Sequence, residues 1–305
     1  MKIQINSPKV SVCVVTYNQE KYIRQCLQSI VDQKTDFDFE VIIGDDGSTD
    51  NTRTIISEFA EKYPCVKTLY NKENIGPYKN FVATHNMANG EFVAHCDGDD
   101  LFLPEKLQKQ VSYLNENTYC TVVWHRVNYF DDQGGFSPGE NADYSMFKNG
   151  KVTIESALRF GSVASHSSIM YRKSARTTYA PGFDTLDMFY SWEYLCSGWG
   201  FILDDVLGEY RVNSSGAITD SPNFNVRALC AHHSKYYLKK YPKNRSDVFV
   251  YSVTGCLIDL KNRNKTAINF FLLALQSFSV HPLNELKAHF QAVRKLRLPV
   301  LHDRR

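Results

Sequence analysis

Residues 91–100 read Glu-Phe-Val-Ala-His-Cys-Asp-Gly-Asp-Asp, an apolar run typical of a buried strand that ends in three closely spaced carboxylates. Carboxylates packed this closely raise one another's pKa unless a cation lies between them, and their oxygens suit hard divalent ions such as Mg²⁺ or Mn²⁺. The same stretch also fits a polar turn in which Gly98 provides the bend and Asp100 caps a helix that starts near Pro104. It therefore predicts a strand that is followed by either a metal site or a turn.

Strand and helix patterns alternate through the first hundred residues. Apolar runs predict strands at residues 10–15, 39–43 and 66–70, and a fourth strand ends at Asp97. Amphipathic runs with helical spacing lie between these strands. The alternation is typical of an α/β protein with a parallel, doubly wound sheet, in which ligands bind beyond the carboxyl ends of the strands.

Polar residues follow the end of each predicted strand, and we expect them to converge on one nucleotide site. A dinucleotide or P-loop site is excluded, because Gly-x-Gly-x-x-Gly does not follow the first strand and Gly-x-x-x-x-Gly-Lys does not occur. An EF-hand is excluded because its third oxygen ligand would fall on Leu101. Phosphate must then be held by a metal and by side chains. The polar sets are Thr16-Tyr17-Asn18, Asp45-Asp46, Asn74 to Gly76 and Asp97 to Asp99.

The composition is that of a globular protein, with 43% hydrophobic and 22% charged residues among 305. The net charge is only +2, yet residues 216–305 carry 15 Lys and Arg against 5 Asp and Glu. Such a basic segment favours contact with an anionic membrane surface and equally fits a solvated helical face. Residues 267–278 are too short an apolar run to cross a bilayer, and the first apolar run is unlike a signal peptide. We expect a cytoplasmic protein, with peripheral contact at the inner face of the cell membrane.

The ordered motifs of the first 115 residues resemble those of the family 2 inverting glycosyltransferases, and in particular those of bacterial cell-surface polysaccharide synthesis. The resemblance implies a GT-A fold, in which a Rossmann-like, mostly parallel sheet is flanked by helices. It also implies a nucleoside-diphosphate sugar, UDP-linked, as donor and Mn²⁺ or Mg²⁺ as cofactor. The motifs are Val10 to Asn18, Val41 to Asp50, Asn74 to Gly76, Asn89-Gly-Glu91 leading to Asp97-Gly-Asp-Asp100, and Leu103 to Leu107.

The same resemblance assigns roles to single residues on the donor side. Asp97 is expected at the ribose and sugar. Asp99, the second carboxylate of the Asp-x-Asp motif, is expected at the metal, with Asp97 as a possible second ligand. The other residues expected to bind the nucleotide sugar are Thr16, Tyr17, Asn18, Glu20, Asp46, Asn74, Gly76 and Lys79.

The acceptor side resembles the family less closely. Asp187 opens a predicted helix at the position of the general base, and Glu193 on the same helix is its rival. His166 and Arg211 are expected on the acceptor or phosphate side. Asn213 stands where the family usually has histidine in Tyr-Arg-x-His, and an amide cannot titrate or bind metal as imidazole does.

These observations predict a nucleotide-sugar-binding half at residues 1–115, an acceptor-binding half of the same domain at 116–216, and a helical, basic C-terminal extension at 217–305. We expect sugar transfer to a hydroxyl of a glycan or lipid-linked glycan, and no nucleic-acid partner. One alternative is a sugar-phosphate nucleotidyltransferase, although its glycine-rich phosphate loop is missing after the first strand. The other is a catalytically inactive nucleotide-sugar-binding protein of the same fold, against which Asp97, Asp99 and Asp187 argue.

Overall fold

The predicted alternation of strands and helices is present in the computed structural model, which describes residues 7–141, 143–212 and 226–280 and the single residues 286, 289, 302 and 303. The first four strands pair in parallel in the order β3-β2-β1-β4. Helices cross over between them, as a parallel sheet requires. The elements are β1 (Val10–Thr16), α1 (Ile23–Val31), β2 (Phe39–Asp45), α2 (Thr52–Lys62), β3 (Val66–Tyr70), α3 (Pro77–Asn86) and β4 (Phe92–Asp97).

The middle of the chain extends this sheet with strands of mixed direction. β9 lies antiparallel between β4 and β6, and the long β10 runs parallel to β6 and also pairs with β5 and β8. The elements are β5 (Leu101–Phe102), α4 (Lys106–Glu116), β6 (Cys120–Phe130), β7 (Gly135–Ser137), η1 (Gly139–Asn141), η2 (Lys148–Gly150), β8 (Lys151–Val152), α5 (Ile154–Phe160), η3 (His166–Ser168), β9 (Met170–Arg172), η4 (Lys173–Ala175), α6 (Asp187–Leu195) and β10 (Trp199–Arg211).

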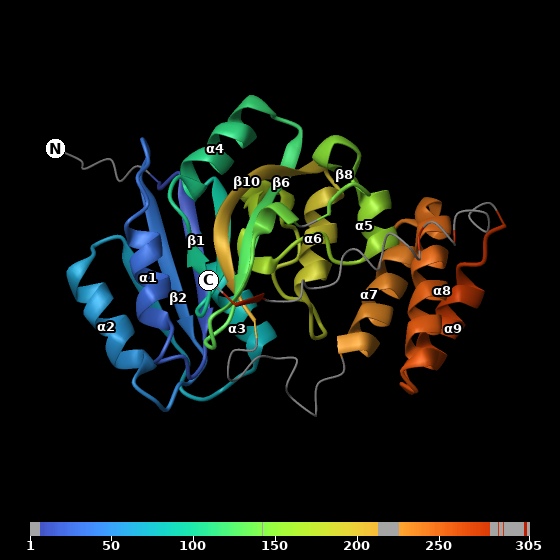
Figure 1. Cartoon of the computed structure of the whole chain (residues 1–305), viewed down its shortest axis with the longest axis horizontal. Coiled ribbons are helices and arrows are strands. Elements are labelled where there is room, and N and C mark those ends of the chain that lie inside the picture. Colours follow the sequence, from blue (N-terminus) through green and yellow to red (C-terminus); the bar gives the residue numbers. More distant parts are fainter. Residues whose placement is uncertain are drawn as a thin grey trace.

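The C-terminal region is helical, as expected, and lies at the end of the molecule away from α1 and α2 (Figure 1). Its helices pack on one another and on α5. Among the described residues, none of the helices combines the length and the apolar character that crossing a bilayer requires. The elements are α7 (Val226–Lys240), η6 (Pro242–Asn244), α8 (Arg245–Lys261) and α9 (Ala267–Gln276), and β11 (His302–Asp303) pairs with β7.

The central strands are buried on both faces of the sheet. Along β1 the side chains alternate, so that Val12 and Val14 pack on one side with α1, α2 and α4, while Cys13 packs on the other. The second side is covered by α3, α5, α6 and the C-terminal helices. With both faces covered by helices, the edge at which the parallel strands end remains the place for polar side chains.

Candidate functional site

Three parallel strands end beside one another at one edge of the sheet. The register pairs Thr16 at the end of β1 with Asp45 at the end of β2, and Val15 with Asp97 at the end of β4. The turns that follow these strands are therefore neighbours. They carry most of the residues that the sequence assigns to the donor.

The turn after β1 is bonded to the turn at residues 48–51. Asn18 adopts a left-handed conformation, with φ of 51°, and its side-chain oxygen accepts a backbone N–H of that turn at 2.8 Å. The carboxylate of Glu20 accepts another N–H of the same turn at 3.0 Å, and Thr16 is buried. Tyr17 is 43% exposed, so it is not the core aromatic that its position at a strand end also allowed. Three of these four residues shape the edge, and the ring of Tyr17 faces solvent.

Asp46 fixes the turn that leads into α3. It is buried, and its carboxylate oxygens accept the backbone N–H groups of Ile75 at 2.8 Å and Gly76 at 3.0 Å. Burial raises the pKa of Asp46, while these hydrogen bonds act against the rise. The side chain of Asn74 accepts the N–H of Gly76 as well, and Lys79 is exposed on α3. Among the residues of this turn that are expected to bind the nucleotide, Asp46 therefore already uses its carboxylate to hold the backbone N–H groups of Ile75 and Gly76.

Asp100 is also engaged within the protein. It is 1% exposed, and its carboxyl oxygens accept the hydroxyl of Ser167 at 2.5 Å and the backbone N–H of Arg211 at 2.8 Å. Burial and the neighbouring aspartates hold the pKa of Asp100 well above its usual range. The interpretation in which Asp100 caps the next helix is wrong, because α4 begins only at Lys106 and its N-cap has no side-chain hydrogen bond.

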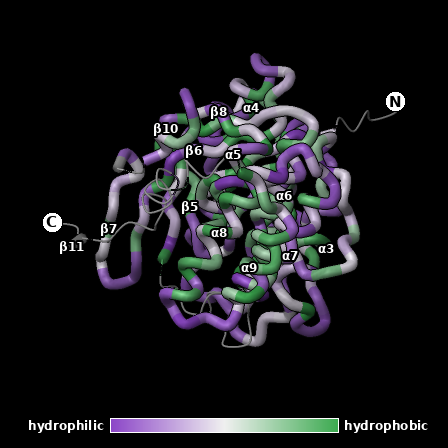
Figure 2. The backbone as a smooth tube through the Cα atoms, turned by 90° about the vertical axis from the view of Figure 1, so that its right-hand side faces the viewer, coloured by the Kyte–Doolittle hydropathy of each residue, from purple (hydrophilic) through white to green (hydrophobic). Residues whose placement is uncertain are grey.

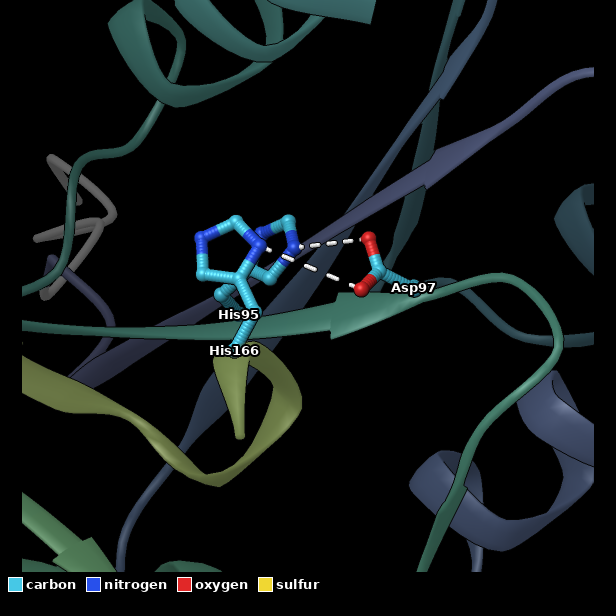
Figure 3. A group of neighbouring side chains, drawn as sticks. All are labelled: His95, Asp97 and His166. Atoms are coloured by element: carbon cyan, nitrogen blue, oxygen red, sulfur yellow. Dashed lines mark hydrogen bonds and ion pairs between the residues drawn. The ribbon is translucent and has the colours of Figure 1, made fainter. Parts of the chain in front are cut away.

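Asp97 lies against two histidines, as Figure 3 shows. Its Oδ1 is 3.1 Å from Nε2 of His95, and its Oδ2 is 3.9 Å from Nδ1 of His166. The two imidazole rings stack with centroids 3.8 Å apart. Burial lowers the pKa of His95 to about 3 and that of His166 to about 4, so both rings are neutral at pH 7. A signal for His95 is present in the sequence, because residues two apart on a strand share a face and His95 is two residues before Asp97.

The donor set at the end of β4 fits a divalent cation. Ligand atoms of His95, Asp97 and His166 lie within 4.8 Å of one another. The carboxylate oxygens of Asp97 and the neutral imidazole of His166 suit Mn²⁺, whereas Nε2 of His95 is engaged with Asp97. Burial raises the pKa of Asp97, and the charge of Asp99 raises the pKa of the adjacent Asp100. A cation there would stabilise the ionised form of these carboxylates.

A chain of buried polar groups continues from Asp97 into the core, and the sequence analysis did not find it. Nδ1 of His95 lies 3.0 Å from Nε2 of His85 on α3, and Nδ1 of His85 lies 2.8 Å from the hydroxyl of Tyr171 on β9. An ionised carboxylate can only accept hydrogen bonds. With both imidazole rings neutral, the hydroxyl of Tyr171 donates to His85, His85 donates to His95, and His95 donates to Asp97. The chain thereby fixes the imidazole that contacts Asp97.

Arg211 holds the acidic turn to β10 and β6. Its Nε donates to the carbonyl of Asp99 at 3.1 Å, and its NH1 donates to Asp132 at 2.5 Å. The guanidinium also lies over the ring of Tyr22, 4.4 Å from its centroid. Arg211 is therefore brought to the site, where it contacts protein groups on several sides. Asn213, its neighbour in the predicted motif, lies outside the described residues.

Asp187 is the first residue of α6 and is partly exposed. Its carboxylate accepts the backbone N–H of Met188 at 2.8 Å. Burial lowers the pKa of His166 and raises that of Tyr210, and the negative charges of Asp97 and Asp187 raise both pKa values. Asp187 thus lies within electrostatic range of the same groups as the acidic turn after β4.

Glu193, the rival of Asp187, lies in the core. It is 2% exposed, and its Oε1 accepts the hydroxyl of Thr177 at 2.8 Å and that of Thr178. Both carboxylates belong to α6, but one is buried and the other is partly exposed. Only Asp187 is placed where a substrate could reach it.

The start of α6 is held by α7. His233, which is fully buried, accepts the backbone N–H of Leu186 at 3.1 Å, one residue before Asp187. The hydroxyl of Tyr237 donates to the carbonyl of Phe189 at 3.0 Å. Burial lowers the pKa of His233 to about 3, so the ring is neutral and can accept. The C-terminal helices therefore set the position of the candidate base.

Comparison with known proteins gives the family of the chain. The family described as Glycosyl transferase family 2 matches residues 11–178. An uncharacterized protein of Mycobacterium tuberculosis is similar at 32% identity over 221 residues, which is 70% of this chain and 63% of that protein. The putative glycosyltransferase EpsE of Bacillus subtilis is 36% identical over 132 residues, which is 42% of this chain and 46% of the EpsE chain. The chain thus spans less than two thirds of the curated relatives that it matches.

Solved structures show the same fold at low sequence identity. The crystal structure of S. aureus TarS 1-349 in complex with UDP-GlcNAc superposes with a TM-score of 0.64 at 21% identity, covering 94% of this chain and 89% of that one. Mannosyltransferase PcManGT from Pyrobaculum calidifontis, in complex with GDP-Man and Mn²⁺, gives a TM-score of 0.52 at 17% identity, with 96% and 86% covered.

Proposed function

Since the chain belongs to glycosyl transferase family 2 and has the GT-A fold, we propose that it transfers a sugar from a nucleoside-diphosphate sugar to an acceptor hydroxyl with inversion at the anomeric carbon. The observation that carries the proposal is the placement of two acidic centres. The parallel strand β4 ends at Asp97, and Asp99 lies two residues beyond it. The partly exposed Asp187 begins α6 within electrostatic range of His166 and Tyr210, as Asp97 is. A single in-line displacement needs one acidic centre at the leaving diphosphate and a base on the opposite face of the sugar.

The donor is proposed to be UDP-linked and to lie along the edge formed by the turns after β1, β2 and β3. The exposed ring of Tyr17 can stack on the base, and Lys79 lies on the first helical turns of α3, within the same edge. Thr16, Asn18, Glu20, Asp46, Asn74 and Gly76 give this edge its shape, as their hydrogen bonds and conformations show. Two fold neighbours were solved with UDP-GlcNAc and with GDP-Man, which supports a nucleotide sugar without selecting the base.

Asp99, with Asp97 beside it, is proposed to hold Mn²⁺ or Mg²⁺. When bound, the ion neutralises charge that develops on the departing nucleoside diphosphate. The protein prepares the carboxylates in advance, because His95 donates to Asp97 and Arg211 fixes the carbonyl of Asp99. The Mn²⁺ in one fold neighbour supports the use of a divalent metal, without assigning its ligands in this chain.

Asp187 is proposed to be the general base, which accepts the proton of the acceptor hydroxyl as that oxygen attacks the anomeric carbon. The hydrogen bond from Met188 and the attachment of Leu186 to His233 orient the start of α6. Burial lowers the pKa of His166, and the charges of Asp97 and Asp187 act against that lowering. We place His166 on the acceptor side with Arg211 and Asn213.

The acceptor is proposed to be a hydroxyl of a glycan or lipid-linked glycan in cell-surface polysaccharide synthesis. In this proposal residues 1–115 bind the donor, residues 116–216 bind the acceptor, and the basic segment 217–305 contacts an anionic membrane on its cytoplasmic side. The surplus of ten positive charges over residues 216–305 supports that contact.

The test is a paired substitution on α6. Asp187→Asn should leave binding of UDP-sugar and Mn²⁺ unchanged, as measured by thermal stabilisation, while transfer falls by roughly 10²–10⁴-fold. Glu193→Gln is the control, because its buried side chain can still accept from the two threonine hydroxyls, and it should retain transfer. A reversed result would make Glu193 the base. If neither variant loses transfer, Asp187 has no part in the reaction, and if the unmodified chain binds no nucleotide sugar, the proposed function is wrong.

A further inference from the structure

Exposed apolar side chains gather on the C-terminal helices. Among the described residues, every exposed Leu, Ile, Val and Phe lies between residues 257 and 280, in α8, α9 or the few residues that follow. The other exposed large apolar side chains are scattered tyrosines and one methionine. Scattered exposure is ordinary, whereas a cluster of this kind indicates an interaction surface. The cluster is Leu257, Leu260, Ile268, Phe271, Leu272, Leu275, Phe278 and Val280.

α9 is apolar on two opposite faces. Phe270 and Leu273 are buried, and the ring of Phe270 packs on that of Tyr251 of α8, with centroids 5.9 Å apart. On the other side Ile268, Leu272 and Leu275 are spaced four and three residues apart, share one face of the helix and are about half exposed. A helix that is apolar all round is normally covered on every side. Within the part of the chain that the structure describes, the outward face of α9 therefore has no partner of the kind that its composition demands.

The turn that joins α8 and α9 supplies positive charge beside this apolar face. Lys261, the last residue of α8, is exposed, as are Arg263 and Lys265 in the turn. Residues 260–280 contain these three cations and no Asp or Glu. Figure 2 looks onto this end of the molecule and shows how apolar segments run along α8 and α9. Apolar side chains flanked by cations are the combination that binds an anionic lipid surface.

The helices that carry this surface are attached to the candidate base. α9 packs on α7 and α8, and α7 holds the start of α6 through His233 and Tyr237. A lipid surface bound at α9 would thus be linked to Asp187 through two layers of packed helices.

We propose that the hairpin of α8 and α9 docks on an anionic bilayer, with the outward side chains of α9 in the interfacial region and Lys261, Arg263 and Lys265 at the lipid phosphates. The inference rests on the proposed function, because a lipid-linked acceptor is what would place the enzyme at a membrane. The inference differs from a diffuse electrostatic attraction of the basic segment to the membrane. Added salt weakens binding that depends on charge, whereas it does not weaken binding that depends on apolar contact.

The test is sedimentation of the full chain with vesicles of phosphatidylcholine, with and without phosphatidylglycerol. The chain should sediment with the anionic vesicles, and high salt should weaken the binding without abolishing it. Leu272→Ser/Leu275→Ser should reduce the partition coefficient by at least about tenfold at every salt concentration. Lys261→Gln/Lys265→Gln should reduce it by about tenfold at low salt and by much less at high salt.

Two controls carry the same kinds of change elsewhere. Tyr119→Ser removes the aromatic side chain that is most exposed among the described residues, at 79%. Lys34→Gln/Lys62→Gln removes two exposed charges from the other end of the chain. Both should sediment as the unmodified chain does. The proposal is overturned if anionic vesicles do not sediment the chain, or if each test pair behaves like its control. It is also overturned if the serine pair only converts a dimer to a monomer, since a second copy would then cover α9. Stabilisation by UDP-sugar without vesicles is measured in parallel, so that failure of the proposed function is seen separately.

Discussion

Substituting Ser167 by alanine should destabilise the protein far more than the loss of one surface hydroxyl would. Ser167 is 6% exposed, and its hydroxyl donates to Asp100 at 2.5 Å and accepts the backbone N–H of Asp97 at 2.9 Å. Ser167→Ala removes both hydrogen bonds and leaves that N–H without its acceptor. Two hydrogen bonds at about 1 kcal/mol each, together with the desolvation of an unpaired group, give a loss of about 3 kcal/mol in the free energy of unfolding.

The adjacent serine provides the control. Ser168 is fully buried, and its hydroxyl makes one hydrogen bond, to the carbonyl of Ser165 at 2.6 Å. Ser168→Ala should therefore cost about 1 kcal/mol. Urea unfolding of both variants in the presence of EDTA, followed by circular dichroism, measures the difference without a contribution from bound metal. Equal losses in the two variants would show that the contacts of Ser167 with the acidic turn contribute no more than a single buried hydrogen bond, which contradicts the prediction.

The same substitution should weaken metal binding although Ser167 is not a proposed ligand. Its hydroxyl fixes the backbone of Asp97 and the side chain of Asp100, between which Asp99 lies. Loss of a supporting contact of this kind lowers metal affinity by about 10–100-fold. Titration with Mn²⁺ in the presence of UDP, measured by calorimetry, gives the affinity. Unchanged Mn²⁺ affinity in Ser167→Ala would mean that the turn holds its shape without this serine.

Three further predictions test other parts of the structure. Asp99→Asn should keep the fold and remove the Mn²⁺ dependence of UDP binding, because an amide offers a hard cation no charge. Calorimetry of UDP binding with and without Mn²⁺ measures this, and an unchanged Mn²⁺ dependence would contradict the assignment of Asp99 to the metal. Gly90→Ala should cost about 3 kcal/mol in urea unfolding, because a Cβ there would lie 2.5 Å from the backbone nitrogen of Ser11, whereas Gly182→Ala, with nothing within 4 Å, should be nearly neutral. Lowering the pH from 7 to 5 should lower the free energy of unfolding by about 2 kcal/mol through His233. Its pKa of about 3 in the folded state lies below the ordinary 6.5, so only the unfolded state takes up the proton. His233→Gln should lack this part of the loss in unfolding titrations, and an unchanged pH dependence of the variant would refute the prediction.

The parallel half of the fold could be predicted because its signals are local. Each strand and helix from β1 to β4 has its own apolar period, and the convergence of the strand ends follows from parallel pairing alone. The apolar pattern of the next segment predicts a strand only over residues 120–127, whereas β6 continues to Phe130. The reason is that Asn128 and Tyr129 look like a loop in sequence, but pairing with β10 keeps them in the sheet.

The partners of the acidic turn could not be predicted from spacing. Ser167 and Arg211 reach Asp100 from 67 and 111 residues away, through pairings of β9 and β10 that no local period specifies. His85 carries only the signal of an amphipathic helix, and its bond to His95 depends on how α3 lies on the sheet. The sequence thus predicted which residues line the edge better than it predicted what holds them there.

These long-range contacts make the donor side and the acceptor side depend on one another. Asp100 belongs to the predicted donor half, yet the two hydrogen-bond partners of its carboxyl group, Ser167 and Arg211, belong to the predicted acceptor half. Asp187 belongs to the acceptor half, yet the residue before it is held by His233 of the C-terminal helices. A fragment that ends at residue 115 would bury Asp100 without a partner or expose it to water, and either outcome would alter the turn that contains Asp97 and Asp99. The geometry of the acidic turn is therefore a property of the assembled chain and not of the motif that identifies it.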